Sequence, residues 1–237
     1  MHQSATRSER GNSMTALIRM RLTAYVRTGR FILPLLSELI LLGVLYGGGR
    51  SGAAESYGVS ALLLFPVLAW QAKLLLDAEP DVQRRLAMAA LGSPAREWTA
   101  GLVAAALVAL PLVLLAIVLP WVFGAVTSVH AGSGVMLGIW AHAIIIPAAV
   151  AIGALSSRPI AGSAGRATAV LASGVVLAFV LGLHGSPVPW LAPPLVTTAR
   201  TLADGAGAAA VAGLTAWALV WGALAVAGYG WLRRSRA

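Results

Sequence analysis

The sequence has 237 residues, of which 59% are hydrophobic and 11% are charged, with a formal net charge of +9 and no cysteine. Soluble domains are about 45–50% apolar and about 25% charged, so this chain has too few polar residues to cover the surface of a soluble fold. The composition excludes a cytosolic enzyme, a nucleic-acid-binding domain and a disordered protein, and it indicates an all-α integral membrane protein.

The N-terminal region divides into two segments before the first long apolar run. Residues 1–13 are polar and are expected to be a disordered tail. Residues 14–30 place apolar side chains near helical spacing with arginines between them, which is typical of an amphipathic helix in the membrane interface. Six arginines precede the first apolar run, whereas signal peptides have far shorter basic regions, so a cleavable signal peptide is not predicted.

Six apolar runs are long enough to be membrane-spanning helices, which need about 20 residues each. Backbone polar groups in lipid must be satisfied internally, so these runs are expected to be helices that form one transmembrane domain over 31–232. Residues 233–237 are expected to be a basic tail. The predicted spans are about 31–47, 58–76, 99–126, 134–155, 167–184 and 208–232.

The basic residues predict the orientation of the chain. With the N-terminus in the cytoplasm, fifteen of the seventeen basic residues fall in inside segments, and only Arg50 and Arg200 fall outside. This asymmetry satisfies the positive-inside rule. Both termini are therefore expected in the cytoplasm, and one span fewer or more would move some basic clusters to the wrong side.

The largest inside loop contains signals for a short helix over 81–91. Asp81 can cap its start, and Gly92 suits the left-handed conformation that follows a helix end. Ser93 and Pro94 are typical of the start of the next helix. The short helix is amphipathic, with apolar side chains on one face. The alternative is a solvated loop with one helical turn.

At this loop the chain resembles the permease subunit of type-2 ABC exporters. The shared features are six spans, an N-terminal interfacial helix, a capped helix between spans two and three, and a long outside segment before span six. They cover about residues 14–232. The family's loop pattern is an acidic residue, a small apolar helix with leucine, and a small residue–Pro–Arg step. The matching positions are Glu79, 86–91, Ser93, Pro94 and Arg96, whereas Pro80 and Asp81 depart from the Gly–Thr-like step more common in the family.

The resemblance implies an ATP-driven exporter in a bacterial plasma membrane. The excess of arginine over lysine and the abundance of alanine and glycine indicate an organism with a GC-rich genome. Residues 81–91 would be the coupling helix, 14–30 the connecting helix, and 185–207 short re-entrant helices. Two permease subunits, identical or different, would associate with two copies of an ATP-binding subunit. The residues expected at the ATPase interface are Asp81, Val82, Arg84, Arg85, Leu86, Ala89 and Ala90.

The chain itself has no signature of an enzyme. It lacks the phosphate-binding pattern G-x-x-x-x-G-K-[ST], so ATP and Mg²⁺ are expected on the partner subunit and no cofactor or metal on this chain. Neither Ser133 nor Ser163 lies in a buried G-x-S-G setting, which argues against an intramembrane protease. The weakly charged spans favour an amphipathic or hydrophobic substrate, such as a natural product, drug, lipid or modified peptide. The alternative is a non-transporting accessory or immunity subunit.

A few polar residues within the spans are candidates for the transport pathway. Glu38, with Ser37 beside it, is the one acidic residue in the core of a predicted span, where a charge costs about 2.5–3.5 kcal/mol. It is expected either to line the pathway or to be a hydrogen-bonded structural carboxyl group. His142 is a candidate proton-linked site, with a packing role as the alternative, and Lys73 is expected to extend to the cytoplasmic interface.

Overall fold

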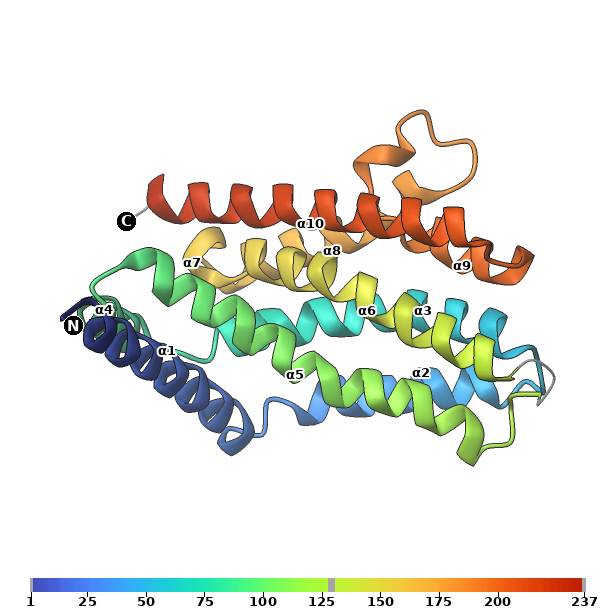
Figure 1. Ribbon diagram of the computed structural model, residues 1–237, viewed down its shortest axis with the longest axis horizontal. Helices are drawn as coiled ribbons and strands as arrows, with labels where there is room; N and C mark the ends of the chain where they lie inside the picture. The colour runs from blue at the N-terminus through green and yellow to red at the C-terminus, as the bar shows by residue number, and fades with distance from the viewer. Residues whose placement is uncertain (1, 128–130, 236–237) are drawn as a thin grey trace.

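The computed structural model describes residues 2–127 and 131–235, with side chains for 13–127 and 132–235. Helices make up most of this part of the chain, and it contains no strand beyond an isolated β-bridge between Ser51 and Val126. The long helices run side by side and form an elongated bundle (Figure 1). The predicted all-helical fold is confirmed.

Apart from the start of α1, the helix boundaries lie within a few residues of those predicted. In chain order the elements are α1 (His2–Arg27), α2 (Ile32–Tyr46), α3 (Ala53–Leu76), α4 (Asp81–Leu91), α5 (Pro94–Val122), α6 (Ala131–Leu155), α7 (Arg158–Ala161), α8 (Ala164–Gly182), the 3₁₀ helix η1 (Pro189–Leu191), α9 (Leu195–Asp204) and α10 (Ala208–Ser235).

Five helices, α3, α5, α6, α8 and α10, are long and apolar enough to cross a membrane. The remaining predicted span, the first one in the chain at 31–47, coincides with α2, which has only 15 residues. At 1.5 Å per residue it is about 22 Å long, shorter than the ~30 Å hydrocarbon core. It reaches the required length only together with α1, from which it is bent by 71°. Five or six helices of the described chain can therefore span a membrane.

Both ends of the chain are more helical than the sequence analysis predicted. α1 begins at His2 rather than at residue 14, so it extends through the segment expected to be disordered. No proline interrupts residues 2–27, and the helix continues through Gly11 and Asn12, although these residues often end helices. Likewise, α10 continues to Ser235 through most of the predicted tail. Residues 1, 236 and 237 lie outside the described residues.

The centre of the bundle is α3, which makes its most extensive contact with α6. Glycines of α6 face α3 at three levels of this contact. A Cβ atom added to Gly134 or Gly138 would lie 2.5 Å from the side chain of Ala53 or Tyr57, and one added to Gly153 would lie 2.5 Å from the backbone oxygen of Ala69. Only glycine allows the two helices to approach this closely, as is common in membrane helix pairs.

The outer surface of the bundle is apolar. Large hydrophobic side chains on α2, α5, α8 and α10 are exposed, among them Val44, Leu114, Val176 and Leu224. A soluble protein would not expose so much apolar surface, whereas helices that contact lipid tails do. The surface thus supports the assignment as a multi-pass membrane protein.

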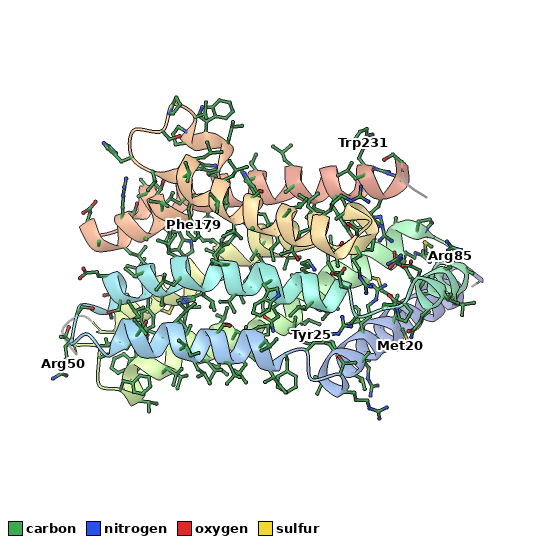
Figure 2. The ribbon with its side chains drawn as sticks, turned by 180° about the vertical axis from the view of Figure 1, so that it is seen from behind. Met20, Tyr25, Arg50, Arg85, Phe179 and Trp231 are labelled. Carbon is green, nitrogen blue, oxygen red and sulfur yellow. The ribbon has the colours of Figure 1, made fainter. Side chains whose placement is uncertain are left out.

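The two ends of the bundle carry different elements. The C-terminal end of α10 and the start of α1 lie beside α4 and α7 at one end, which we call the α4 end (Figure 1). Arg85 and Trp231 lie at this end, whereas Arg50 lies at the opposite end (Figure 2). Near that opposite end, α9 packs against α3 and buries Leu195 and Leu202.

Candidate functional site at the α4 end

The ends of α4 follow from local sequence. Its range, Asp81–Leu91, is the range predicted, and Gly92 after it has a φ of 63°. Ser93 is extended and Pro94 begins α5, but the Ser93 side chain makes no capping hydrogen bond. The predicted capping role of Asp81 is wrong: Pro80 holds the capping position, and Asp81 is the first helical residue. Its carboxylate instead forms an ion pair with Arg84.

Most of α4 projects into solvent. Its apolar face is open, because Val82 and Leu86 are 70% and 66% exposed. Arg84 is partly buried, whereas the other predicted interface residues, Asp81, Arg85, Ala89 and Ala90, are exposed. The helix is held at its C-terminal end, where Leu91 packs with Leu17 of α1 and Ala100 of α5. The structure therefore places all seven predicted residues on one accessible helix.

An apolar groove separates α4 from α1. It has a volume of about 330 Å³. The walls come from neighbouring turns of the two helices, and they include Leu17 and Met20 of α1 and Leu86, Ala87 and Ala90 of α4. Leu86 thus belongs both to the exposed face and to the groove, so a partner that seats on α4 would also contact α1.

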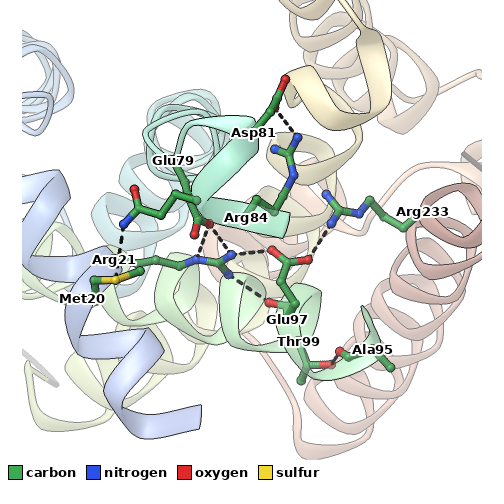
Figure 3. A network of polar contacts seen from close by, with 10 residues as sticks. Met20, Arg21, Glu79, Asp81, Arg84, Ala95, Glu97, Thr99 and Arg233 are labelled. Atoms are coloured by element: carbon green, nitrogen blue, oxygen red, sulfur yellow. Dashed lines mark hydrogen bonds and ion pairs between the residues drawn. The ribbon is translucent and has the colours of Figure 1, made fainter. Parts of the chain in front are cut away.

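A buried ionic cluster lies beneath α4 (Figure 3). Arg21 of α1 donates from Nε to Glu79 Oε2 at 3.0 Å and from Nη1 to the Glu97 carbonyl oxygen at 2.9 Å. Its Nη2 also pairs with the Glu97 carboxylate. The second oxygen of that carboxylate accepts a hydrogen bond from Arg233 Nη2 of α10 at 2.6 Å. Two cations and two anions therefore join α1, the segment before α4, α5 and α10.

Burial makes this cluster energetically important. The side chains of Arg21, Glu79 and Glu97 are at most 7% exposed, and that of Arg233 is 11% exposed. A buried ion pair is strongly destabilised when one partner is removed, because the remaining charge has neither water nor a counter-ion. Gly101 of α5 makes room for the Arg21 guanidinium group, since a Cβ atom at Gly101 would lie 2.8 Å from Arg21 Nη1.

A second ionic cluster fixes the end of α3. Lys73 Nζ lies 2.8 Å from Asp77 Oδ2, and the backbone N–H of Arg158 donates to Asp77 Oδ1 at 2.7 Å. Lys73, which was expected to extend to the cytoplasmic interface, is held in this ion pair with its side chain 11% exposed. Asp77 links the C-terminal end of α3 to the start of α7.

Sequence reasoning singled out Glu79 but missed Arg21, Glu97 and Arg233. A signal for Glu97 was available, because an acidic residue in the first turn of a long apolar helix needs a partner. The choice of partner depended on the bend between α1 and α2, which local sequence does not specify.

The three pathway candidates do not form one site. Glu38 is fully buried on α2, and neither carboxylate oxygen has a hydrogen-bond partner among the described residues. Ser37, beside it, is partly exposed. His142 of α6 is also fully buried, but it hydrogen-bonds to Ser60 and Gly138, so nothing connects it to Glu38.

The surroundings of His142 favour a packing role. Its Nδ1 lies 2.8 Å from the Gly138 carbonyl oxygen, which can only accept, so Nδ1 carries the proton. Its Nε2 lies 3.1 Å from Ser60 Oγ, and its ring meets that of Tyr57 edge to face. Both ring nitrogens are thus occupied in the neutral imidazole.

The described side chains include no group of three His, Asp or Glu residues placed to hold a metal ion. Comparisons of the chain with protein-family models, curated proteins and solved structures found no match.

Proposed function

We propose that this chain is the permease subunit of an ATP-driven exporter and that α4 docks into a separate ATP-binding subunit. Two permease subunits face each other around one pathway, and each receives force from its own ATP-binding subunit. The α4 end lies in the cytoplasm of a bacterial cell, and ATP and Mg²⁺ bind to the partner. The observation that carries the proposal is the exposed apolar face of α4 at the end where both termini lie.

Docking of α4 is supported by the hydrophobic effect. Val82 and Leu86 are 70% and 66% exposed on a helix anchored to the bundle at one end. Full burial of an aliphatic side chain contributes about 1.5–3 kcal/mol. A partner groove that buries both side chains would therefore contribute several kcal/mol to the free energy of binding. Arg85, exposed on the same helix, adds charge that an acidic groove would attract.

Transmission of force is supported by the buried ionic cluster beneath α4. Glu79 lies two residues before α4 and pairs with Arg21, which in turn pairs with Glu97 at the start of α5. A displacement of α4 therefore acts on α1 and α5 through charged contacts as well as through the chain. ATP-driven closure of the partner subunits would in this way move α3 and α5 and open the pathway.

The apolar bundle supports the proposed substrate class. The described helices carry few charges away from their ends, which favours an amphipathic or hydrophobic substrate over a highly charged one. α9, which packs against α3, would close the outer end of the pathway as a short re-entrant helix.

The test is affinity purification of the tagged full chain from its native membranes in mild detergent. We expect a stoichiometric partner with a G-x-x-x-x-G-K-[ST] sequence and vanadate-sensitive ATP hydrolysis. The variant Leu86→Arg, which places a charge in the docking face, should lose both the partner and substrate transport while it still inserts into the membrane. Deletion of residues 82–91 should have the same effect.

The matched control is Leu191→Arg. Leu191 is also an exposed leucine, at 50%, but it lies in η1, which packs against α8 rather than on α4. The Leu191→Arg variant should still co-purify with the ATP-binding subunit and should retain ATP hydrolysis. Normal transport by a correctly inserted Leu86→Arg protein would refute the docking role of α4. A wild-type chain that purifies without an ATPase would refute the exporter and favour an accessory subunit.

A further inference from the structure

A second pocket at the α4 end has a volume of about 560 Å³ and shares no residue with the groove between α1 and α4. α8 and α10 each pack against α6 and α7, and all four helices contribute to its walls. One charged side chain therefore lies in the wall of an otherwise apolar pocket. The lining residues include Leu155, Ile160, Arg166, Ala169, Val170 and Leu232.

Local contacts hold the Arg166 side chain in place. Its Nε donates to Ser163 Oγ at 3.2 Å. Gly162 precedes Ser163 with a φ of 78°, and a Cβ atom there would lie 2.9 Å from Arg166 Nη2, so glycine leaves room for the guanidinium group over the turn between α7 and α8. Neither terminal nitrogen of Arg166 has an acceptor among the described residues. Both are therefore available to an anion.

No carboxylate of the described chain neutralises Arg166. The acidic side chains of the α4 end each form an ion pair with another cation of the chain, and they are Asp77, Glu79, Asp81 and Glu97. An anionic group in the pocket would gain the attraction of Arg166 without a competing charge. A zwitterionic group would bring an ammonium ion that finds no unpaired carboxylate at this end. The charges therefore favour a ligand with net negative charge.

The pocket has the polarity gradient of a lipid leaflet. α8 can cross a membrane and begins at Ala164, so Arg166 in its first turn lies near the end of a span. Ala169 and Val170 lie one turn further along α8, about 5 Å deeper at 1.5 Å per residue. Val170 is 43% exposed, so the pocket opens onto the apolar outer surface of the bundle. A phospholipid has the same order, with its phosphate at the interface and its acyl chains further inside.

We propose that this pocket binds an anionic phospholipid. The phosphate accepts hydrogen bonds from the two terminal nitrogens of Arg166, a geometry that a guanidinium group suits well. The upper part of one acyl chain lies against Ile160, Ala169 and Val170. Anionic lipids are enriched on the cytoplasmic side of membranes, where basic pockets between helices bind their headgroups.

The inference requires only that the chain is a multi-pass membrane protein. It involves neither ATP nor the ATP-binding subunit, and no residue of α4 lines the pocket. A negative result would therefore leave the docking role of α4 unaffected.

The experiment measures lipid binding to the purified full chain in mild detergent by native mass spectrometry. The probes are phosphatidylglycerol and phosphatidylcholine with identical acyl chains, and the readout is the Kd of the first bound lipid. We expect phosphatidylglycerol to bind more tightly. Arg166→Gln should weaken phosphatidylglycerol binding about fivefold, which corresponds to about 1 kcal/mol for one arginine near an anionic lipid. Arg85→Gln removes an exposed arginine of the same end that does not line the pocket, and it should leave the Kd unchanged.

A second variant tests the apolar walls. Ala169→Phe fills the pocket and should weaken the binding of both lipids. Ala172→Phe, at an exposed alanine of α8 that does not line the pocket, should bind both as the wild type does.

Four results would overturn the proposal. The first is equal binding of the two lipids by the wild type, and the second is an equal effect of Arg166→Gln and Arg85→Gln. The third is displacement of phosphatidylglycerol by inorganic phosphate alone, which would make the site one for a free anion. The fourth is a lipid-free wild-type dimer that Ala169→Phe converts to a monomer, which would show that a second copy of the chain fills the pocket.

Discussion

Replacement of Arg21 by methionine tests whether the ionic cluster under α4 holds the α4 end together. The substitution keeps much of the side-chain volume but leaves Glu79 without its cation and Glu97 with Arg233 alone. Breaking a buried ion pair on one side costs about 3–5 kcal/mol. The equilibrium constant for unfolding should therefore rise by roughly two to four orders of magnitude.

The assay is reversible unfolding in mixed micelles with increasing sodium dodecyl sulfate, followed by circular dichroism. Arg84→Met is the matched control, because its partner Asp81 has a side chain that is 76% exposed. An exposed pair contributes less than about 1 kcal/mol. The double variant Arg21→Met/Glu79→Gln should recover part of the loss, since it no longer buries an unpaired carboxylate. Equal, small losses in Arg21→Met and Arg84→Met would refute the reasoning.

Two glycine substitutions test close packing in the same assay. Gly101→Ala places a Cβ atom 2.8 Å from Arg21 Nη1, which can shift, so we expect a loss of about 1 kcal/mol; Gly213→Ala, with open space around it, should cause no loss. Gly153→Ala places a Cβ atom 2.5 Å from a backbone oxygen of α3, which cannot shift, so we expect a loss of about 3 kcal/mol or more. Gly132→Ala, in open space on the same helix, is its control, and an equally stable Gly153→Ala would contradict the close contact of α3 with α6.

The sequence alone predicted the helical elements well because their ends carry strong local signals. Gly92 and Pro94 mark the end of α4 and the start of α5, and the structure has both boundaries there. The start of α1 was wrong, since polar composition alone does not prevent a helix. The role of α4 in docking stays a prediction.

The contacts between helices could not be predicted, because they depend on which faces meet. Apolar helices show weak periodicity when lipid surrounds them, so the sequence did not reveal that the glycines of α6 face α3. The same applies to the partners of Glu97. Glu38 was recognisable as unusual from its place in an apolar run, but only the packing of α2 showed that it lacks a partner.

The segment between α3 and α4 is short, and contacts hold it at two points. Asp77 is held by Lys73 and by the N–H group of Arg158, while Glu79, two residues later, is held by Arg21. If α4 were displaced, a longer or more flexible linker would change its own conformation and would not transmit the displacement. Here a displacement of α4 would instead pass directly to α7 through Asp77 and to α1 through Glu79. Insertion of a few glycines after Ala78 would therefore uncouple α4 from the bundle. A partner could still bind α4, but a movement of α4 would no longer be transmitted to the other helices.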